Sequence, residues 1–170
     1  MGVLARAITY ATLYIGFFLV YLPARILDWS GIQVPAGLGP RQLVGLGLSG
    51  AGALLAITCV LTFVFRGHGT PAPFDPPRRL VQRGPYRFIR NPMYLGAGLA
   101  MLGAGVYYGS WAIVIYVAVF LISAHALVRL YEEPALRHQF GTEYEAYCAT
   151  TPRWLPIRRP RHPRTVSGGA

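Results

Sequence analysis

The chain has no lysine and few charged residues of any kind. Charged side chains make up 13% of its 170 residues, and 54% of the residues are hydrophobic. Soluble domains carry about 25% charged residues, so this composition argues against a soluble domain. We expect an integral membrane protein, most simply one of a prokaryotic cytoplasmic membrane, whose first partner is the lipid bilayer.

Cysteine and histidine are also scarce. The 2 cysteines, Cys59 and Cys148, lie far apart and the 4 histidines are scattered. This spacing predicts neither a disulfide framework nor a metal site. His125 is the one histidine at membrane depth, where we expect a hydrogen-bonded packing role.

Only 6 residues are acidic, and all 16 basic residues are arginine, which gives a pI near 10.2. A GC-rich genome would produce the same preference for arginine. Nucleic acid is the obvious alternative partner of a basic chain. However, the arginines lie at the ends of apolar runs and no recognition motif accompanies them. Attraction to anionic lipid head groups is the simpler interpretation, so we expect no nucleic-acid partner.

Uncharged runs of 18, 24 and 38 residues lie between successive arginines: Arg6–Arg25, Arg41–Arg66 and Arg90–Arg129. A signal peptide is the alternative for the first run, but no convincing cleavage site follows it, so we interpret it as a retained span. The third run would make a helix of about 57 Å, against a bilayer core of about 30 Å. We therefore expect two spans there, with a break at residues 107–110.

The positions of the arginines predict the orientation. Six of them fall within residues 66–90 and five more beyond Thr151. The positive-inside rule then places both segments, and with four spans the N-terminus too, in the cytoplasm. We predict an all-α polytopic membrane helix bundle of about four transmembrane helices. A C-terminal interfacial helix from Pro134 and an interfacial anchor at Trp154 should follow.

We expect one integral-membrane domain over residues 1–158, with its motif-bearing core at 78–156 and a disordered basic tail at 159–170. The proline-rich segment 67–77 is either a linker or a stiff lid over the site. Small residues recur every four positions in the second and third spans, which predicts close helix packing in lipid. These residues are Gly45, Ser49, Ala53, Gly96, Ala100 and Ala104.

Two polar clusters flank the 38-residue run. RGPYRFIRNPMY at residues 83–94 precedes it, and Glu132-Glu133 follow it. Two antiparallel spans would return both acids to the side where the first cluster lies. Pro134 should bend or end the helix at the acids. Arg129 could pair with either acid in an ordinary surface cluster, but ionisable groups at membrane depth usually have a function.

The pattern of these clusters resembles that of the isoprenylcysteine carboxyl methyltransferase and phospholipid methyltransferase superfamily. That pattern is close to LV-x-x-G-x-Y-x-x-x-RHP-x-Y-x-G, an uncharged hairpin, and EE-x-x-L-x-x-x-FG-x-x-Y-x-x-Y. The matching positions are Leu80, Val81, Gly84, Tyr86, Arg90, Pro92, Tyr94, Gly96, Glu132, Glu133, Leu136, Phe140, Gly141, Tyr144 and Tyr147. The family histidine is replaced by Asn91, which can form hydrogen bonds but cannot carry a proton.

The resemblance implies a membrane enzyme that transfers a methyl group from S-adenosyl-L-methionine to a lipophilic or prenylated acceptor. Glu132 or Glu133 would bind the cofactor ribose, and Arg79 or Arg90 its carboxylate. The remaining cofactor residues would be Leu80, Val81, Tyr86, Asn91, Pro92, Met93, Tyr94 and Gly96. As catalytic residues we expect Arg129, which would orient the acceptor, and Glu133.

Two other functions fit the sequence. A related membrane architecture serves NADPH-dependent sterol reductases, and glycine-rich spans would also suit a non-catalytic membrane scaffold. Measuring which cofactor binds would separate these functions. The sequence also leaves the methyl acceptor open, since a prenylcysteine carboxylate and a lipid head group both fit.

Overall fold

The computed structural model describes residues 9, 12–67 and 79–156, and every regular element within them is a helix. The predicted all-α class is therefore confirmed. In chain order the elements are η1 (Ile15–Tyr21), α2 (Leu22–Trp29), α3 (Pro40–Thr62), η2 (Phe63–Gly67), η3 (Gly84–Arg87), α4 (Pro92–Tyr108), α5 (Trp111–Leu127), η4 (Val128–Glu132), α6 (Glu133–Phe140) and α7 (Thr142–Thr150). Most of the proline-rich segment and the C-terminal tail lie outside the described residues.

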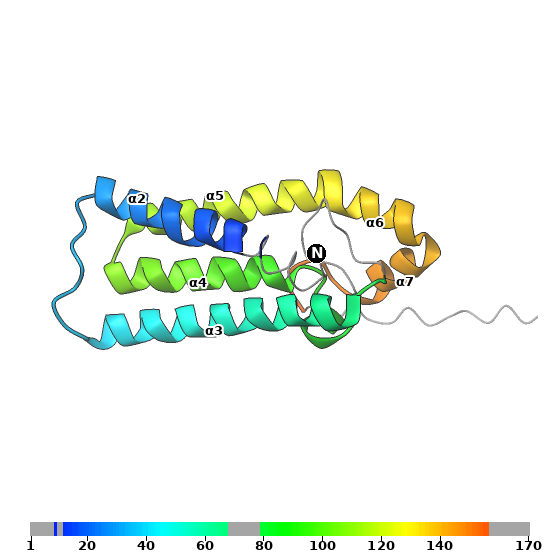
Figure 1. The fold of residues 1–170 in the computed structure, drawn as a ribbon, viewed down its shortest axis with the longest axis horizontal. Helices are drawn as coiled ribbons and strands as arrows, with labels where there is room; N and C mark the ends of the chain where they lie inside the picture. The colour runs from blue at the N-terminus through cyan, green and yellow to red at the C-terminus, as the bar shows by residue number, and fades with distance from the viewer. Residues whose placement is uncertain (1–8, 10–11, 68–78, 157–170) are drawn as a thin grey trace, which may run out of the picture.

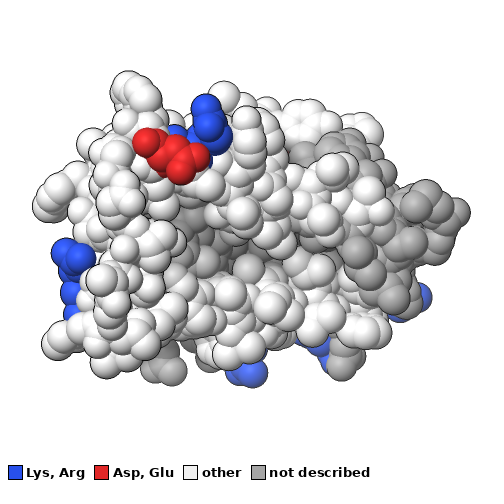
Figure 2. Space-filling model, turned by 60° about the vertical axis from the view of Figure 1, so that its left-hand side comes forward, with Lys and Arg blue, Asp and Glu red and all other residues white. Residues whose placement is uncertain are grey.

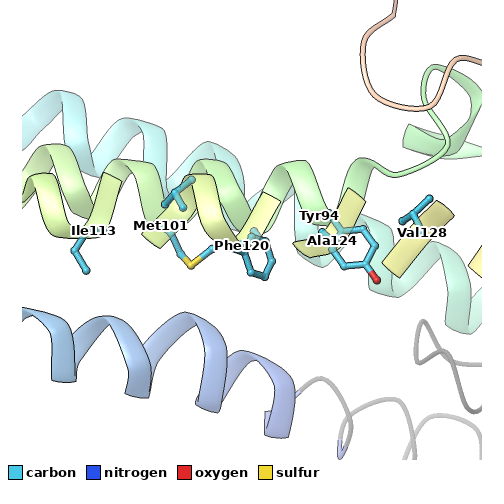
Figure 3. Close-up of a cluster of buried hydrophobic side chains, with 8 residues drawn as sticks. Tyr94, Met101, Ile113, Phe120, Ala124 and Val128 are labelled. Atoms are coloured by element: carbon cyan, nitrogen blue, oxygen red, sulfur yellow. The ribbon is translucent and has the colours of Figure 1, made fainter. Parts of the chain in front are cut away.

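The long helices run antiparallel to their neighbours, with α4 between α3 and α5 (Figure 1). The helix formed by η1 and α2 packs on α5. Buried Met101, Ile113 and Phe120 lie between α4 and α5 on the side that faces α2 (Figure 3). These contacts pack α4 against α5 along the hairpin.

Three of the described helices are long and apolar enough to cross a membrane: Thr12–Trp29, Pro40–Phe65 and Trp111–Phe140. The other expected span, α4, has 17 residues, or about 26 Å. The fourth crossing therefore stays a prediction. The packing of α4 along α3 and α5 supports it.

The predicted break in the third apolar run is confirmed. Gly109 ends α4 with a left-handed backbone (φ 65°), which glycine adopts without strain. Ser110 then caps α5, since its Oγ accepts a hydrogen bond from the Ile113 backbone nitrogen at 3.3 Å.

Close packing of the two glycine-rich helices is also confirmed, with a small correction of register. A Cβ on Gly52 would lie 2.3 Å from the Ala100 backbone nitrogen, and one on Gly103 would lie 2.4 Å from that of Ser49. Gly52, rather than the predicted Ala53, faces α4, because contact positions on a helix alternate between spacings of three and four. The Ser49 hydroxyl donates to the Ala100 carbonyl at 2.9 Å.

The helix does not end at Glu132-Glu133, which was one of the two outcomes predicted there, and the other outcome, a bend, stays a prediction. The helix continues to Phe140 through the π-turn η4, and Pro134 falls in the first turn of α6. Proline is tolerated there because its missing N–H is not needed. The chain breaks instead at Gly141 (φ 50°), so two short helices replace the single one expected from Pro134.

Charged residues are unevenly distributed between the two ends of the bundle. The end with the α2–α3 connection comes forward in Figure 2, where uncharged side chains cover most of the surface. The ion pair between Arg25 and Asp28 there is exposed and 3.8 Å long. The opposite end, where α4 begins, carries the polar clusters described next.

Candidate active site

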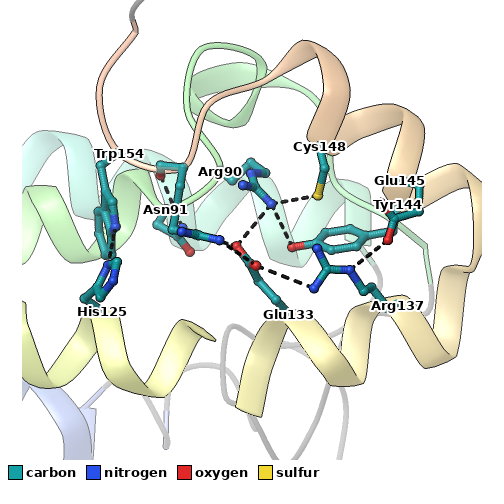
Figure 4. A network of polar contacts seen from close by, with 10 residues as sticks. Arg90, Asn91, His125, Glu133, Arg137, Tyr144, Glu145, Cys148 and Trp154 are labelled. Carbon is teal, nitrogen blue, oxygen red and sulfur yellow. Dashed lines mark hydrogen bonds and ion pairs between the residues drawn. The ribbon is translucent and has the colours of Figure 1, made fainter. Parts of the chain in front are cut away.

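The start of α4 and the end of α5 come together at one end of the bundle (Figure 4). Tyr94 contacts Glu132 and Arg90 contacts Glu133, although 38 and 43 residues separate them in the sequence. The predicted return of the two acids to the first polar cluster is thus confirmed. After α7, the segment Thr151–Pro156 also turns back to this end.

Glu133 lies at the centre of an arginine cluster. Arg153 binds both of its carboxylate oxygens, from Nε at 2.6 Å and from Nη2 at 2.8 Å. Arg90 Nη1 lies 3.1 Å from the same carboxylate and Arg137 Nη1 lies 3.8 Å from it. Glu133 is only 3% exposed. Its carboxylate is therefore fully engaged by protein groups, and Arg129, its predicted partner, is not one of them.

Glu132 has different surroundings, although it is the adjacent residue. Within the described part of the chain it accepts one hydrogen bond, from the Tyr94 hydroxyl, and forms no ion pair. The difference follows from helical geometry, because consecutive side chains point about 100° apart. Glu132 thus keeps a partly buried carboxylate whose partner is neutral.

Arg90 connects the acids to α7. Its Nη1 donates to the Cys148 sulfur at 2.7 Å and to the Tyr144 hydroxyl at 3.4 Å. Burial raises the pKa of the Tyr144 phenol, which is neutral at physiological pH. The Arg90 Nε is buried and has no hydrogen-bond acceptor among the described residues. One buried donor at this site therefore has no acceptor.

The C-terminal segment supplies contacts that the sequence did not reveal. Asn91, which is 9% exposed, donates from Nδ2 to the Arg153 carbonyl at 3.2 Å. The Trp154 indole nitrogen donates to His125 Nδ1 at 2.9 Å. His125 has the hydrogen-bonded packing role predicted for it. Trp154 packs inside the site rather than serving only as an anchor, and no pattern in the sequence pairs it with His125.

The other predicted site residues divide into separate groups. Val81 and Tyr86 are buried around Cys59 of α3, with Met93 packed against them, whereas Tyr94 belongs to the cluster between α4 and α5. The two predicted cofactor residues Tyr86 and Tyr94 therefore lie in different clusters. Leu80 is partly buried.

Four further predicted residues have simple positions. Arg79 and Arg129 are exposed, and Pro92 is buried in the first turn of α4. Gly96 lies in the α3–α4 contact, where an added Cβ would be 2.9 Å from the Ala56 backbone nitrogen. Close helix packing therefore accounts for this glycine without a cofactor.

A family model described as phospholipid methyltransferase matches residues 40–143, more than half of the chain. Comparison with curated proteins and with solved structures gave no significant match. The matched region begins at α3 and includes the start of α4 and both acids. The sequence-based resemblance is confirmed, and the chain belongs to the phospholipid methyltransferase family.

Proposed function

We propose that this protein is a membrane methyltransferase that transfers a methyl group from S-adenosyl-L-methionine to a lipophilic acceptor. The observation that carries the proposal is that the two adjacent acids have different binding partners. Three arginines engage the carboxylate of Glu133, whereas the partly buried carboxylate of Glu132 has Tyr94 as its one hydrogen-bond partner among the described residues.

The groups at this end suit the cofactor. A ribose diol has two donors, which a carboxylate such as that of Glu132 accepts well. The Nε of Arg90, which has no acceptor in the part of the chain that the structure describes, is a donor for an acidic group. The rings of Tyr94 and Trp154, with centroids 6.5 Å apart, supply apolar surface. The donor and acceptor set therefore fits the cofactor.

Bound S-adenosyl-L-methionine would supply a methyl group on a positively charged sulfur, which a nucleophile displaces in line. The protein then has mainly to align the reactants and exclude water. Tyr94 orients Glu132 through its hydroxyl, and Glu133 holds Arg90 and Arg153 in place around the site. Asn91 cannot transfer a proton, and this chemistry asks for none at that position.

The acceptor would approach from the lipid. Arg129 is exposed on the same helix end, where its guanidinium can bind a carboxylate or a phosphate group of an acceptor. The arginine-rich end is the predicted cytoplasmic one, so we place the site facing the cytoplasm, in reach of a soluble cofactor.

Calorimetric titration of S-adenosyl-L-methionine into the protein in nanodiscs tests the proposal. Glu132→Gln removes one charge and keeps the shape of the side chain. We expect about a ten- to hundredfold loss of affinity, since a hydrogen bond to a charged group contributes about 1.5–3 kcal/mol. Glu143→Gln is the matched control, because Glu143 is an exposed acid on α7 that contacts only Gln82 among the described residues.

The same titration with NADPH separates the alternatives. Binding of NADPH instead would support a reductase, and binding of neither cofactor would support a scaffold. Incubation of the protein with radiolabelled S-adenosyl-L-methionine and total membrane lipids, followed by separation of the lipids, would then identify the acceptor. A wild-type protein that labels no lipid or prenylated compound contradicts the proposed reaction.

A further inference from the structure

The segment Thr151–Pro156 follows the last helix, beyond the family match at residues 40–143. It docks on the rest of the site through contacts from successive residues. The Pro152 carbonyl accepts from the Arg90 backbone nitrogen at 2.9 Å. Arg153 binds Glu133 with its side chain and Asn91 with its carbonyl. These contacts hold Pro152 and Arg153 against the start of α4 and against Glu133.

Trp154 makes the next contact of the segment, a hydrogen bond to His125. An indole N–H can only donate, so His125 Nδ1 must accept through its lone pair. The distance of 2.9 Å is that of an ordinary N–H···N hydrogen bond. The two rings also lie against each other, with centroids 5.9 Å apart and planes inclined by 34°.

Trp154 also lies against Tyr94, the residue that binds the candidate cofactor-binding carboxylate of Glu132. Its ring lies 6.5 Å, centroid to centroid, from that of Tyr94. The Tyr94 hydroxyl in turn donates to Glu132. His125 and Glu132 belong to one continuous helix, Trp111–Phe140. The contacts therefore form a closed loop from His125 through Trp154 and Tyr94 back to the same helix at Glu132.

We propose that His125 and Trp154 are positioning residues of the methyltransferase site. Their hydrogen bond holds the C-terminal segment over the start of α4, and the Trp154 ring fixes the orientation in which Tyr94 presents Glu132 to the cofactor. This inference rests on the proposed function, because it assigns the two residues a role in the same site. It concerns a segment that the family model does not cover.

Four variants isolate the hydrogen bond. His125→Leu removes the acceptor, and Trp154→Phe removes the donor but keeps an aromatic ring. The double variant removes both partners. His125→Asn is the rescue variant, since its side-chain oxygen lies where Nδ1 was and can accept the indole N–H.

Exposed residues of the same types provide the controls. His138→Leu changes an exposed histidine of α6, and Trp111→Phe changes a tryptophan that is 79% exposed. Neither contacts the C-terminal segment through a hydrogen bond in the described part of the chain. Thermal unfolding of every variant establishes that it is folded before binding is measured.

The main measurement is the Kd for S-adenosyl-L-methionine, with KM and kcat for methyl transfer beside it. Each single variant should raise Kd and KM about two- to tenfold, the effect of one hydrogen bond, with a smaller change in kcat. The double variant should lose no more than the worse single variant, because both changes break the same bond. His125→Asn and both controls should keep wild-type affinity.

An independent readout concerns the bond itself. In a background with Trp29→Phe and Trp111→Phe, the fluorescence emission of Trp154 should shift when His125→Leu is introduced and stay unchanged with His125→Asn. Folded His125→Leu and Trp154→Phe variants with wild-type Kd overturn the inference, and so do losses that multiply in the double variant. A wild-type protein that binds no S-adenosyl-L-methionine overturns the proposed function, and this inference with it, even if the fluorescence shift occurs.

Discussion

Glu133→Gln should destabilise the protein far more than any other single charge neutralisation at this end of the bundle. The substitution keeps the size of the side chain and removes its negative charge. Arg90, whose side chain is 11% exposed, and Arg153, at 29%, would then lose the carboxylate that both contact. A buried charge without a counter-ion has a large free-energy cost, because it has left water without compensation.

The magnitude follows from the burial. Breaking a buried ion pair by removing one partner costs about 3–5 kcal/mol. For a chain of this length each kcal/mol lowers Tm by about 2–4 °C, so the expected decrease is about 6–20 °C. The third pair, with Arg137, adds little, because it is 3.8 Å long and Arg137 is 46% exposed.

Thermal unfolding followed by circular dichroism at 222 nm, in one detergent at constant concentration, measures the effect. Glu145→Gln is the matched control. Glu145 also forms an ion pair, with Arg137 at 2.7 Å, but its side chain is 58% exposed. Exposed pairs contribute at most about 1 kcal/mol, so its Tm should fall by no more than about 4 °C.

The comparison between the two glutamates decides the result. Equal decreases in Tm for Glu133→Gln and Glu145→Gln would refute the reasoning, because the buried cluster would then contribute no more than a surface pair. In that case Glu133 would not be needed to hold Arg90 and Arg153 in place. The catalytic role predicted for its carboxylate would then gain support.

Three further outcomes are expected. Gly52→Ala should lower Tm strongly, since its Cβ would lie 2.3 Å from a backbone nitrogen of α4. Gly47→Ala is the control and should leave Tm unchanged, because its Cβ would have nothing within 4 Å. Equal Tm values for the two variants would contradict the packing of α3 on α4. Asn91→Leu should cost about 1–3 kcal/mol in unfolding free energy by removing the donor to the partly buried Arg153 carbonyl. Asn91→His, which retains a donor, should cost less in the same melt. In spheroplasts, an impermeant thiol reagent should label a cysteine at Gly37 and spare one at Thr142; the reverse pattern would contradict the orientation.

Local chemistry was sufficient to predict the hairpin. The length of the uncharged run requires two crossings of a bilayer core, and only the Gly109-Ser110 region interrupts it. Both signals act within a few residues, through backbone freedom and capping, so they do not depend on the rest of the fold. The approach of Glu132 and Glu133 to the start of α4 follows from the same hairpin.

The helix does not end at the two acids, and the reason is the position of Pro134. Pro134 disfavours helical geometry in the residue before it, and this local preference alone predicts a bend or an end at the acids. The structure places the proline in the first turn of α6, after a π-turn, where it interrupts no needed hydrogen bond. At this point of the helix Glu133 binds Arg153, which lies 20 residues away in the sequence, so no local pattern could predict the contact.

By itself, the sequence determined the helical class, the membrane environment and the pairing of two polar clusters, because hydrophobic run length and turn chemistry are local properties. It could not distinguish the two acids, since the order of two adjacent residues does not show where their side chains point. Only the tertiary structure assigned Glu133 to the arginines and Glu132 to Tyr94, because a rotation of about 100° between neighbours on a helix selects different partners. It also brought Trp154 to His125, because the return of a C-terminal segment depends on the shape of the surface that receives it.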